Sequence, residues 1–242
     1  MITVSRGLSA GSAVLVALLA LLAATIGLGV LGWVVGLACG VITVVAVGRG
    51  TDTLGPADLV TLGRAVVTCA LGALVADSFV HDAEVVTLVV LATVATGADA
   101  VDGWVARHTR TSSPFGARFD GEVDAFLFLV LSVYVADSGP VWVLAIGLAR
   151  YAFAAAGWVL PWMRAQLPPR WWRKVAAAVQ GVVLTVAVAD VTPSWLTTAA
   201  LALALALLTE SFGRDVVWLW RHRSGERQGL TRPAGRSRVV GP

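Results

Sequence analysis

Four aspartates recur at short intervals between residues 99 and 124, in a chain that is otherwise strongly apolar. On a helix, Asp99 and Asp102 would be i and i+3, and Asp120 and Asp124 would be i and i+4, so the two members of each pair would share a face. Two adjacent helices would then direct all four carboxylates at one point.

Such a cluster needs cations inside it, because like charges a few ångströms apart in a poorly hydrated site cannot all stay ionised. A set of carboxylate oxygens without Cys or His suits Mg²⁺ or Mn²⁺ and does not suit zinc. Two such ions bridged by shared carboxylates form the clamp that serves displacement at phosphorus. The aspartates therefore predict a divalent-metal site for phosphoryl chemistry. The alternative is that these acids cap neighbouring helices.

The aspartates belong to a longer pattern of eight specified residues, D-x2-D-G-x2-A-R-x8-G-x3-D-x3-D, which runs from Asp99 to Asp124. A chance match in a chain of this length is rarer than about one in a million, at roughly 5 to 7% usage of each residue type. The pattern resembles the signature of the CDP-alcohol phosphotransferases, and every fixed position of that signature is matched here.

The resemblance implies an integral membrane phosphatidyltransferase of phospholipid biosynthesis. Such an enzyme moves a phosphatidyl, or related CDP-activated phosphoryl, group from a CDP-diacylglycerol-like donor to a polar alcohol or sugar-alcohol phosphate and releases CMP. Asp99, Asp102, Asp120 and Asp124 match the family's ligands for two ions, and Asp124 also matches its general base. Membrane lipid is an implied partner, nucleic acid is not, and family members are often homodimers.

Further residues match positions at which relatives contact the donor, namely Gly103, Arg107 and Ser113. Gly103 leaves room for the close approach of a nucleotide, and Arg107 offers a planar fork of donors to phosphate. The alternative for Arg107 is a solvated arginine at a cytoplasmic helix end.

A segment ahead of the signature also resembles the family. It begins near Pro56, contains Asp58 and ends in the Thr-x-x-Arg sequence from Thr61 to Arg64. In relatives a similar segment contacts the nucleotide of the donor. The alternative for Asp58 and Thr61 is simple capping of a helix that begins at Pro56.

Arg150 lies within an apolar run, where an arginine costs about 2.5 to 3.5 kcal/mol on insertion scales and is expected to face a polar cavity or an acid. It either pairs with one of the four aspartates or Glu210, or binds a phosphate of donor or acceptor.

A Lys-x5-Gln sequence, Lys174 to Gln180, is similar to a segment of the phosphatidylglycerophosphate synthases. Ala176 stands where that segment has a second lysine, so the sequence leaves the acceptor undetermined.

The rest of the chain must hold these residues in a membrane. Its 242 residues are 57% hydrophobic and 14% charged, with a mean hydropathy of +0.81, which is typical of a polytopic membrane protein. We expect an all-α, polytopic membrane helical bundle of eight helices: an N-terminal transmembrane hairpin in 1–50, a six-helix family core in 51–214 and a basic cytoplasmic tail in 215–242. The apolar runs lie at about 11–47 (two runs), 59–76, 85–98, 125–136, 141–160, 175–189 and 196–208.

Charge predicts the orientation of these runs. With a cytoplasmic amino terminus, the arginines and lysines gather on the cytoplasmic side and most loop acids on the other, as the positive-inside rule requires. We therefore expect a multi-pass protein of the cell membrane with its active site on the cytoplasmic side.

The rival class is a secondary transporter whose intramembrane carboxylates couple to protons or ions. Transport predicts broken helices in two related halves. The sequence has no convincing internal repeat, and its acids cluster at one edge of the membrane. An inactive relative is disfavoured because no signature position is missing.

Overall fold

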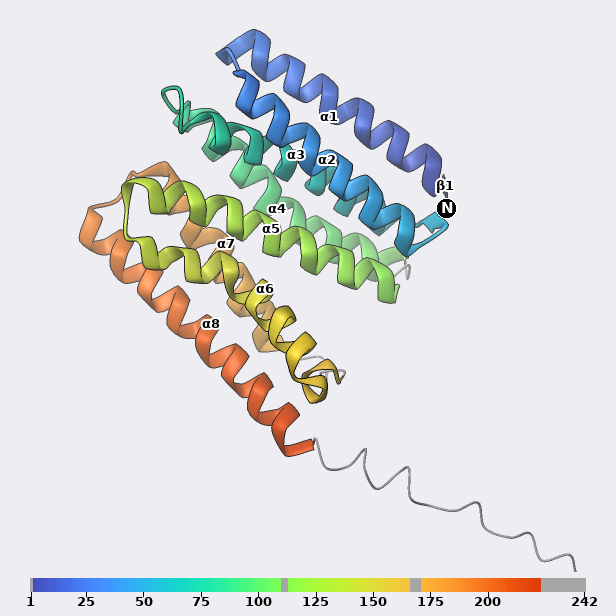
Figure 1. The fold of residues 1–242 in the computed structure, drawn as a ribbon, viewed down its shortest axis with the longest axis vertical. Coiled ribbons are helices and arrows are strands. Elements are labelled where there is room, and N and C mark those ends of the chain that lie inside the picture. The colour runs from blue at the N-terminus through green and yellow to red at the C-terminus, as the bar shows by residue number, and fades with distance from the viewer. Residues whose placement is uncertain (1, 110–112, 166–170, 223–242) are drawn as a thin grey trace, which may run out of the picture.

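The computed structural model describes residues 2–109, 113–165 and 171–222, and at residues 100, 102–107, 109, 164 and 171 it describes the backbone alone. Within these residues the chain forms eight α-helices and one pair of two-residue strands (Figure 1). The helices are α1 (Val4–Ile26), α2 (Val30–Gly50), α3 (Pro56–Asp77), α4 (Val85–Thr109), α5 (Pro114–Ser138), α6 (Leu144–Val159), α7 (Trp171–Ala189) and α8 (Ser194–His222). The strands are β1 (Ile2–Thr3) and β2 (Thr53–Leu54), and the 3₁₀ turns Val141–Val143 and Pro161–Arg164 precede and follow α6.

Six helical segments of the described chain are long and apolar enough to cross a membrane. They comprise α1, α2, α3, α6, α7 and α8. The other two helices, α4 and α5, have 25 residues each, a length that also suffices for a crossing. Both extend beyond the apolar runs into the aspartate signature, which lowers their hydropathy. The prediction of an all-α, polytopic membrane bundle is confirmed.

Helix α3 lies at the centre of one half of the bundle, where it packs against α1, α2, α4 and α5. Most of its side chains are buried, whereas α1 and α2 expose most of theirs. Small buried residues such as Ala70 and Ala73 let the neighbouring backbones approach closely. A polar residue on α3 is therefore held far more firmly than one on an outer helix.

Helices α3, α4, α5 and α7 surround a common interior. α4 packs against α3 and α7, α5 packs against α3, α6 and α7, and α8 packs against α7, while α4 and α5 touch each other only slightly. Leucines from these helices form the apolar core, including Leu71, Leu88, Leu131 and Leu184. Side chains from α4 and α5 can therefore meet only across the space between the four helices.

The N-terminal hairpin of α1 and α2 lies along α3, at the blue end of the bundle in Figure 1. A Cβ at Gly36 of α2 would lie 3.0 Å from the Cβ of Ala73, so this glycine permits the close packing of α2 on α3. β1 pairs with β2 directly before α3, and the amide of Gly29 donates to Asp77 Oδ1 (3.1 Å) at the other end of α3. The hairpin therefore fixes α3 at both ends.

Candidate active site

Three of the signature aspartates converge. Asp99 comes from α4, and Asp120 and Asp124 come from successive turns of α5. One carboxylate oxygen from each lies within 4.8 Å of the others. Asp102 lies in α4 three residues after Asp99, and its side chain is outside the described part of the structure. The expected meeting of acids from two helices is thus seen for the three aspartates whose side chains are described.

Arg64 of α3 lies between these carboxylates. Its Nη1 is 2.6 Å from Asp120 Oδ1 and 3.2 Å from Asp99 Oδ1, and its Nη2 pairs with Asp124 Oδ1. Its Nε donates to the carbonyl of Ala95 (3.2 Å), and its side chain is 1% exposed. The guanidinium therefore links α3, α4 and α5 through a single buried cation.

The sequence predicts Arg64 in the donor-binding segment, because Thr-x-x-Arg resembles the family there, and it does not predict Arg64 in this cluster. The signal that could have identified it is an arginine within an apolar helix, which needs an acidic partner or a polar cavity.

Asp58 and Thr61 make local contacts near the start of α3. Asp58 is 5% exposed, and its Oδ2 accepts a hydrogen bond from the amide of Gly55 (2.8 Å). Thr61 is 3% exposed, and its hydroxyl donates to the carbonyl of Ala57 (3.2 Å). The contact of Asp58 is that of a helix cap, which was the alternative expectation for this segment.

Ser113 and Gly116 bring the start of α5 against that cap. Ser113 is the N-cap of α5, and its hydroxyl accepts a hydrogen bond from the amide of Gly116 (2.8 Å). A Cβ at Gly116 would collide with the carboxylate of Asp58, so the signature requires glycine for close approach at this position. Gly103 and Arg107 lie in the last turns of α4, and at these two residues the structure describes the backbone alone.

A cavity of about 580 Å³ adjoins the aspartates. Its lining carries the three carboxylates together with basic and amide groups from α6 and α7. These basic and amide groups are Arg150, Arg173, Lys174 and Gln180. The cavity can therefore hold a ligand that meets both acids and cations.

Arg150 is held by an acid that the sequence analysis did not name. Its Nη2 lies 2.5 Å from Glu122 Oε1, on α5. The expected partner in the pairing alternative was one of the four aspartates or Glu210, but Glu210 pairs with Arg214. Glu122 stands between the two aspartates of α5 in the sequence, outside the fixed positions of the signature, so the signature gives no reason to expect this pair.

Arg173 and Asp215 form a second pair at the basic side. Arg173 Nε lies 3.5 Å from Asp215 Oδ2, and the side chain of Asp215 is 5% exposed. Asp215 belongs to α8, so this pair ties the start of α7 to the last helix of the bundle.

Gln180 adds a buried amide to the cavity. The residue is 2% exposed, and its Nε2 has no hydrogen-bond partner among the described residues. Leaving such a donor unpaired costs about 1–3 kcal/mol, so the amide is suited to donate to an oxygen of a bound ligand.

An apolar groove opens from the cavity between α6 and α8. Its volume is about 420 Å³, and it shares Ala149, Leu208 and Phe212 with the lining of the cavity. An apolar surface therefore extends from the carboxylates toward the outside of the bundle.

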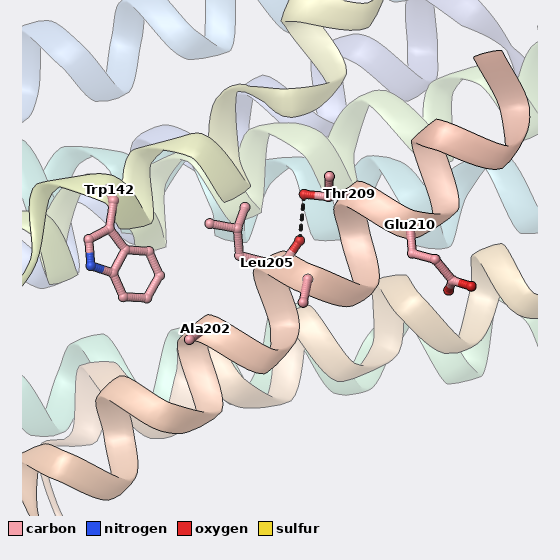
Figure 2. Close-up of a pocket in the computed structure, with 6 residues that line it drawn as sticks. Trp142, Ala202, Leu205, Thr209 and Glu210 are labelled. Atoms are coloured by element: carbon pink, nitrogen blue, oxygen red, sulfur yellow. Dashed lines mark hydrogen bonds between the residues drawn. The ribbon is translucent and has the colours of Figure 1, made fainter. Parts of the chain in front are cut away.

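A further hollow, of about 590 Å³, lies between α8 and the turn Val141–Val143 (Figure 2). Trp142, Leu205 and Thr209 line it, and the Thr209 hydroxyl donates to the carbonyl of Leu205 (2.8 Å). Its lining is apolar apart from Thr209 and Glu210, and it shares no lining residue with the cavity at the aspartates. It lacks a set of groups that could perform phosphoryl chemistry.

Carboxylates that converge beside basic residues, inside a bundle of membrane helices, are suited to a membrane protein that transfers phosphoryl groups. The model of one protein family, CDP-alcohol phosphatidyltransferase, matches residues 55–209. This match spans well over half of the chain and includes the three converging aspartates. The chain therefore belongs to the CDP-alcohol phosphatidyltransferase family, and the expected membership is confirmed. The searches of curated proteins and of solved structures gave no match.

The family's use of divalent metal is compatible with the residues present. The ligand atoms are carboxylate oxygens, which suit a hard cation, and the three described acids are close enough to share one. The two N-terminal helices lie outside the matched residues.

Proposed function

We propose that this protein is an integral membrane phosphatidyltransferase of phospholipid biosynthesis. It transfers a phosphatidyl, or related CDP-activated phosphoryl, group from a CDP-diacylglycerol-like lipid to a polar alcohol and releases CMP. The observation that carries the proposal is the convergence of Asp99, Asp120 and Asp124 beside a cavity that basic residues also line.

Asp99, Asp102, Asp120 and Asp124 are the proposed ligands of two Mg²⁺ or Mn²⁺ ions. Bound there, the ions neutralise the pyrophosphate of the donor and stabilise the departing CMP. Asp124 is the proposed general base, which takes the proton of the attacking hydroxyl. It lines the cavity and has the least exposed carboxylate of the three described, at 23%. An aspartate is a weak base, so the orientation of the alcohol must supply much of the rate.

The donor is proposed to bind near the starts of α3 and α5 and the end of α4. Gly103, Arg107, Ser113, Asp58 and Thr61 contact its nucleotide in this proposal. The close approach of Asp58 to Gly116 supports a common binding surface for the two helix starts. The apolar groove between α6 and α8 would receive its acyl chains, because the groove continues from the cavity.

The acceptor is proposed to be an alcohol that carries a phosphate. Arg150, Arg173 and Lys174 supply three cationic groups, and Gln180 supplies an unpaired donor, in the lining of the same cavity. A phosphate held there would leave the hydroxyl of the same molecule free to reach Asp124. The site lies on the cytoplasmic side of the cell membrane in this proposal, as the distribution of charged loops predicts.

The test uses the purified full-length protein, CDP-diacylglycerol and a panel of alcohols. Glycerol 3-phosphate and inositol phosphate are compared with glycerol and inositol, with Mg²⁺, Mn²⁺ or EDTA, and CMP release is measured. We expect metal-dependent CMP release with a phosphorylated alcohol. Absence of CMP with every acceptor would contradict the proposal, and ion flux by the protein in liposomes would support the transporter instead.

A further inference from the structure

The three carboxylates that suit a metal already share one cation, Arg64. The guanidinium contacts Oδ1 of Asp99, of Asp120 and of Asp124, so one oxygen of each acid is engaged by it. An arginine remains charged in any protein environment. The cluster therefore carries a permanent positive charge at the point where a divalent cation would bind.

The position of this charge is fixed by its surroundings. Arg64 belongs to the most buried of the candidate membrane helices, and its side chain is 1% exposed. Its Nε is held by the carbonyl of Ala95, on α4. Arg64 cannot swing into solvent as a surface arginine can, so its charge stays close to the acids whatever else binds there.

We propose that Arg64 is the resident counter-ion of the cluster: it keeps the acids together in the metal-free protein and competes with divalent cations for them. This inference rests on the metal site of the proposed function. Without a cation, three acids gathered within 4.8 Å repel one another, and Arg64 offsets that repulsion. When a divalent cation is present, the same charge repels it and occupies oxygens that it would use.

A competing role predicts an effect of opposite sign. If Arg64 only oriented the carboxylates, as outer-shell partners of metal ligands do, its loss would weaken metal affinity by about 10- to 100-fold. If Arg64 competes with the metal, its loss strengthens affinity. The direction of the change in Mn²⁺ affinity therefore distinguishes the two roles without any measurement of catalysis.

The experiment compares wild type with Arg64→Gln, as full-length proteins in detergent. Free Mn²⁺ is measured by electron paramagnetic resonance, and thermal unfolding is recorded with EDTA and with Mn²⁺. Arg214→Gln is the matched control, because Arg214 is also ion-paired but lies outside the cluster, with Glu210 as its partner. Asp120→Asn identifies the bound Mn²⁺ as that of the cluster.

We expect Arg64→Gln to bind Mn²⁺ at least about tenfold more tightly than wild type, because a positive charge a few ångströms away has been removed. Its Tm should fall in EDTA and rise more with Mn²⁺ than that of wild type. Arg214→Gln should match wild type in Mn²⁺ affinity, and Asp120→Asn should bind more weakly.

Unchanged or weaker Mn²⁺ binding by Arg64→Gln would overturn the inference. If the variant does not accumulate in folded form, it is prepared again with Mn²⁺ present throughout. Recovery by Mn²⁺ supports the inference, since one cation then replaces another, and failure to recover overturns it.

A wild type that releases CMP while Arg64→Gln binds Mn²⁺ no more tightly refutes this inference alone. A wild type that neither binds Mn²⁺ through Asp120 nor releases CMP refutes the proposed function as well.

Discussion

Two sets of charged residues line the cavity, and they neutralise their charges in different ways. The acidic side, Asp99, Asp120 and Asp124, shares Arg64, whose side chain is 1% exposed, while the carboxylates are 48%, 37% and 23% exposed. The basic side includes Arg150, which pairs with Glu122, and these two side chains are 43% and 59% exposed. The acidic side is thus a network around one buried cation, whereas both members of the Arg150 pair are partly screened by solvent. Substitutions should therefore act strongly and jointly on the acidic side and weakly and locally on the basic side.

The comparison also suggests how a reaction is divided between the two sides. The acids attract cations and can take a proton, whereas partly exposed arginines bind an anion without much cost of desolvation. The reacting hydroxyl would lie between them. Loss of a group on the acidic side should reduce kcat, and loss of a group on the basic side should raise the KM of the acceptor.

The largest effect is expected from Asp124→Asn. The amide cannot take a proton, so kcat for CMP release should fall by about 10²- to 10⁴-fold at saturating Mn²⁺ and substrates. The measurement is steady-state CMP release, with Mn²⁺ binding recorded on the same preparation. Asp82→Asn, in the exposed loop between α3 and α4, is the matched control and should retain wild-type rates. A reduction of less than tenfold in Asp124→Asn would show that the base is another group.

The acidic side was the more predictable of the two. The spacing of Asp99, Asp120 and Asp124 indicated shared helix faces, and the structure brings these three together. Hydropathy likewise predicted the eight helices and the hairpin, since a long apolar run in a membrane must satisfy its backbone hydrogen bonds internally and therefore forms a helix. Spacing within a helix is local information, and the sequence contains it directly.

The partners of the charged residues could not be predicted in this way. Arg64 meets the aspartates only because α3 lies between α4 and α5, and the packing order of helices does not follow from hydropathy. Glu122 meets Arg150 because α5 packs against α6. Both pairings depend on tertiary contacts, which periodicity within one segment does not encode.

Arg150→Gln should give the next largest effect. Hydrogen bonds to charged groups contribute about 1.5–3 kcal/mol, so the KM of a phosphorylated acceptor should rise by about 10- to 100-fold. The KM of CDP-diacylglycerol should change little, because Arg150 belongs to the proposed acceptor site and not to the proposed nucleotide site. Arg214→Gln, on the exposed face of α8, serves as the control. An equal rise in both KM values would mean that Arg150 contacts the donor.

Gln180→Met tests the unpaired amide of the basic side. In the ligand-free protein, an apolar side chain of similar length removes a buried donor without a partner, so stability should rise by about 1 kcal/mol. The KM of the acceptor should rise by about fivefold, since one neutral hydrogen bond is lost. Thermal unfolding and CMP release are measured on one preparation. A lower Tm for the variant would show that Gln180 is already satisfied in the empty protein.

Glu122→Gln should have the smallest effect. The direction of its change in acceptor KM tests whether the counter-ions of the acidic and basic sides have the same role. Glu122 is the counter-ion of Arg150, and Arg64 is the counter-ion of the acids. A ligand must share or displace each of these counter-ions. Because the side chains of the Arg150 pair are 43% and 59% exposed, an ion pair of this kind contributes about 0–1 kcal/mol. Glu122→Gln should therefore lower the KM of a phosphorylated acceptor by no more than about fivefold.

In the Arg150→Gln background the same change should have no effect, because Glu122 then has no guanidinium to compete for. A rise in KM in the single variant would mean that Glu122 orients Arg150 for the acceptor, and the two counter-ions would then differ in role as well as in burial.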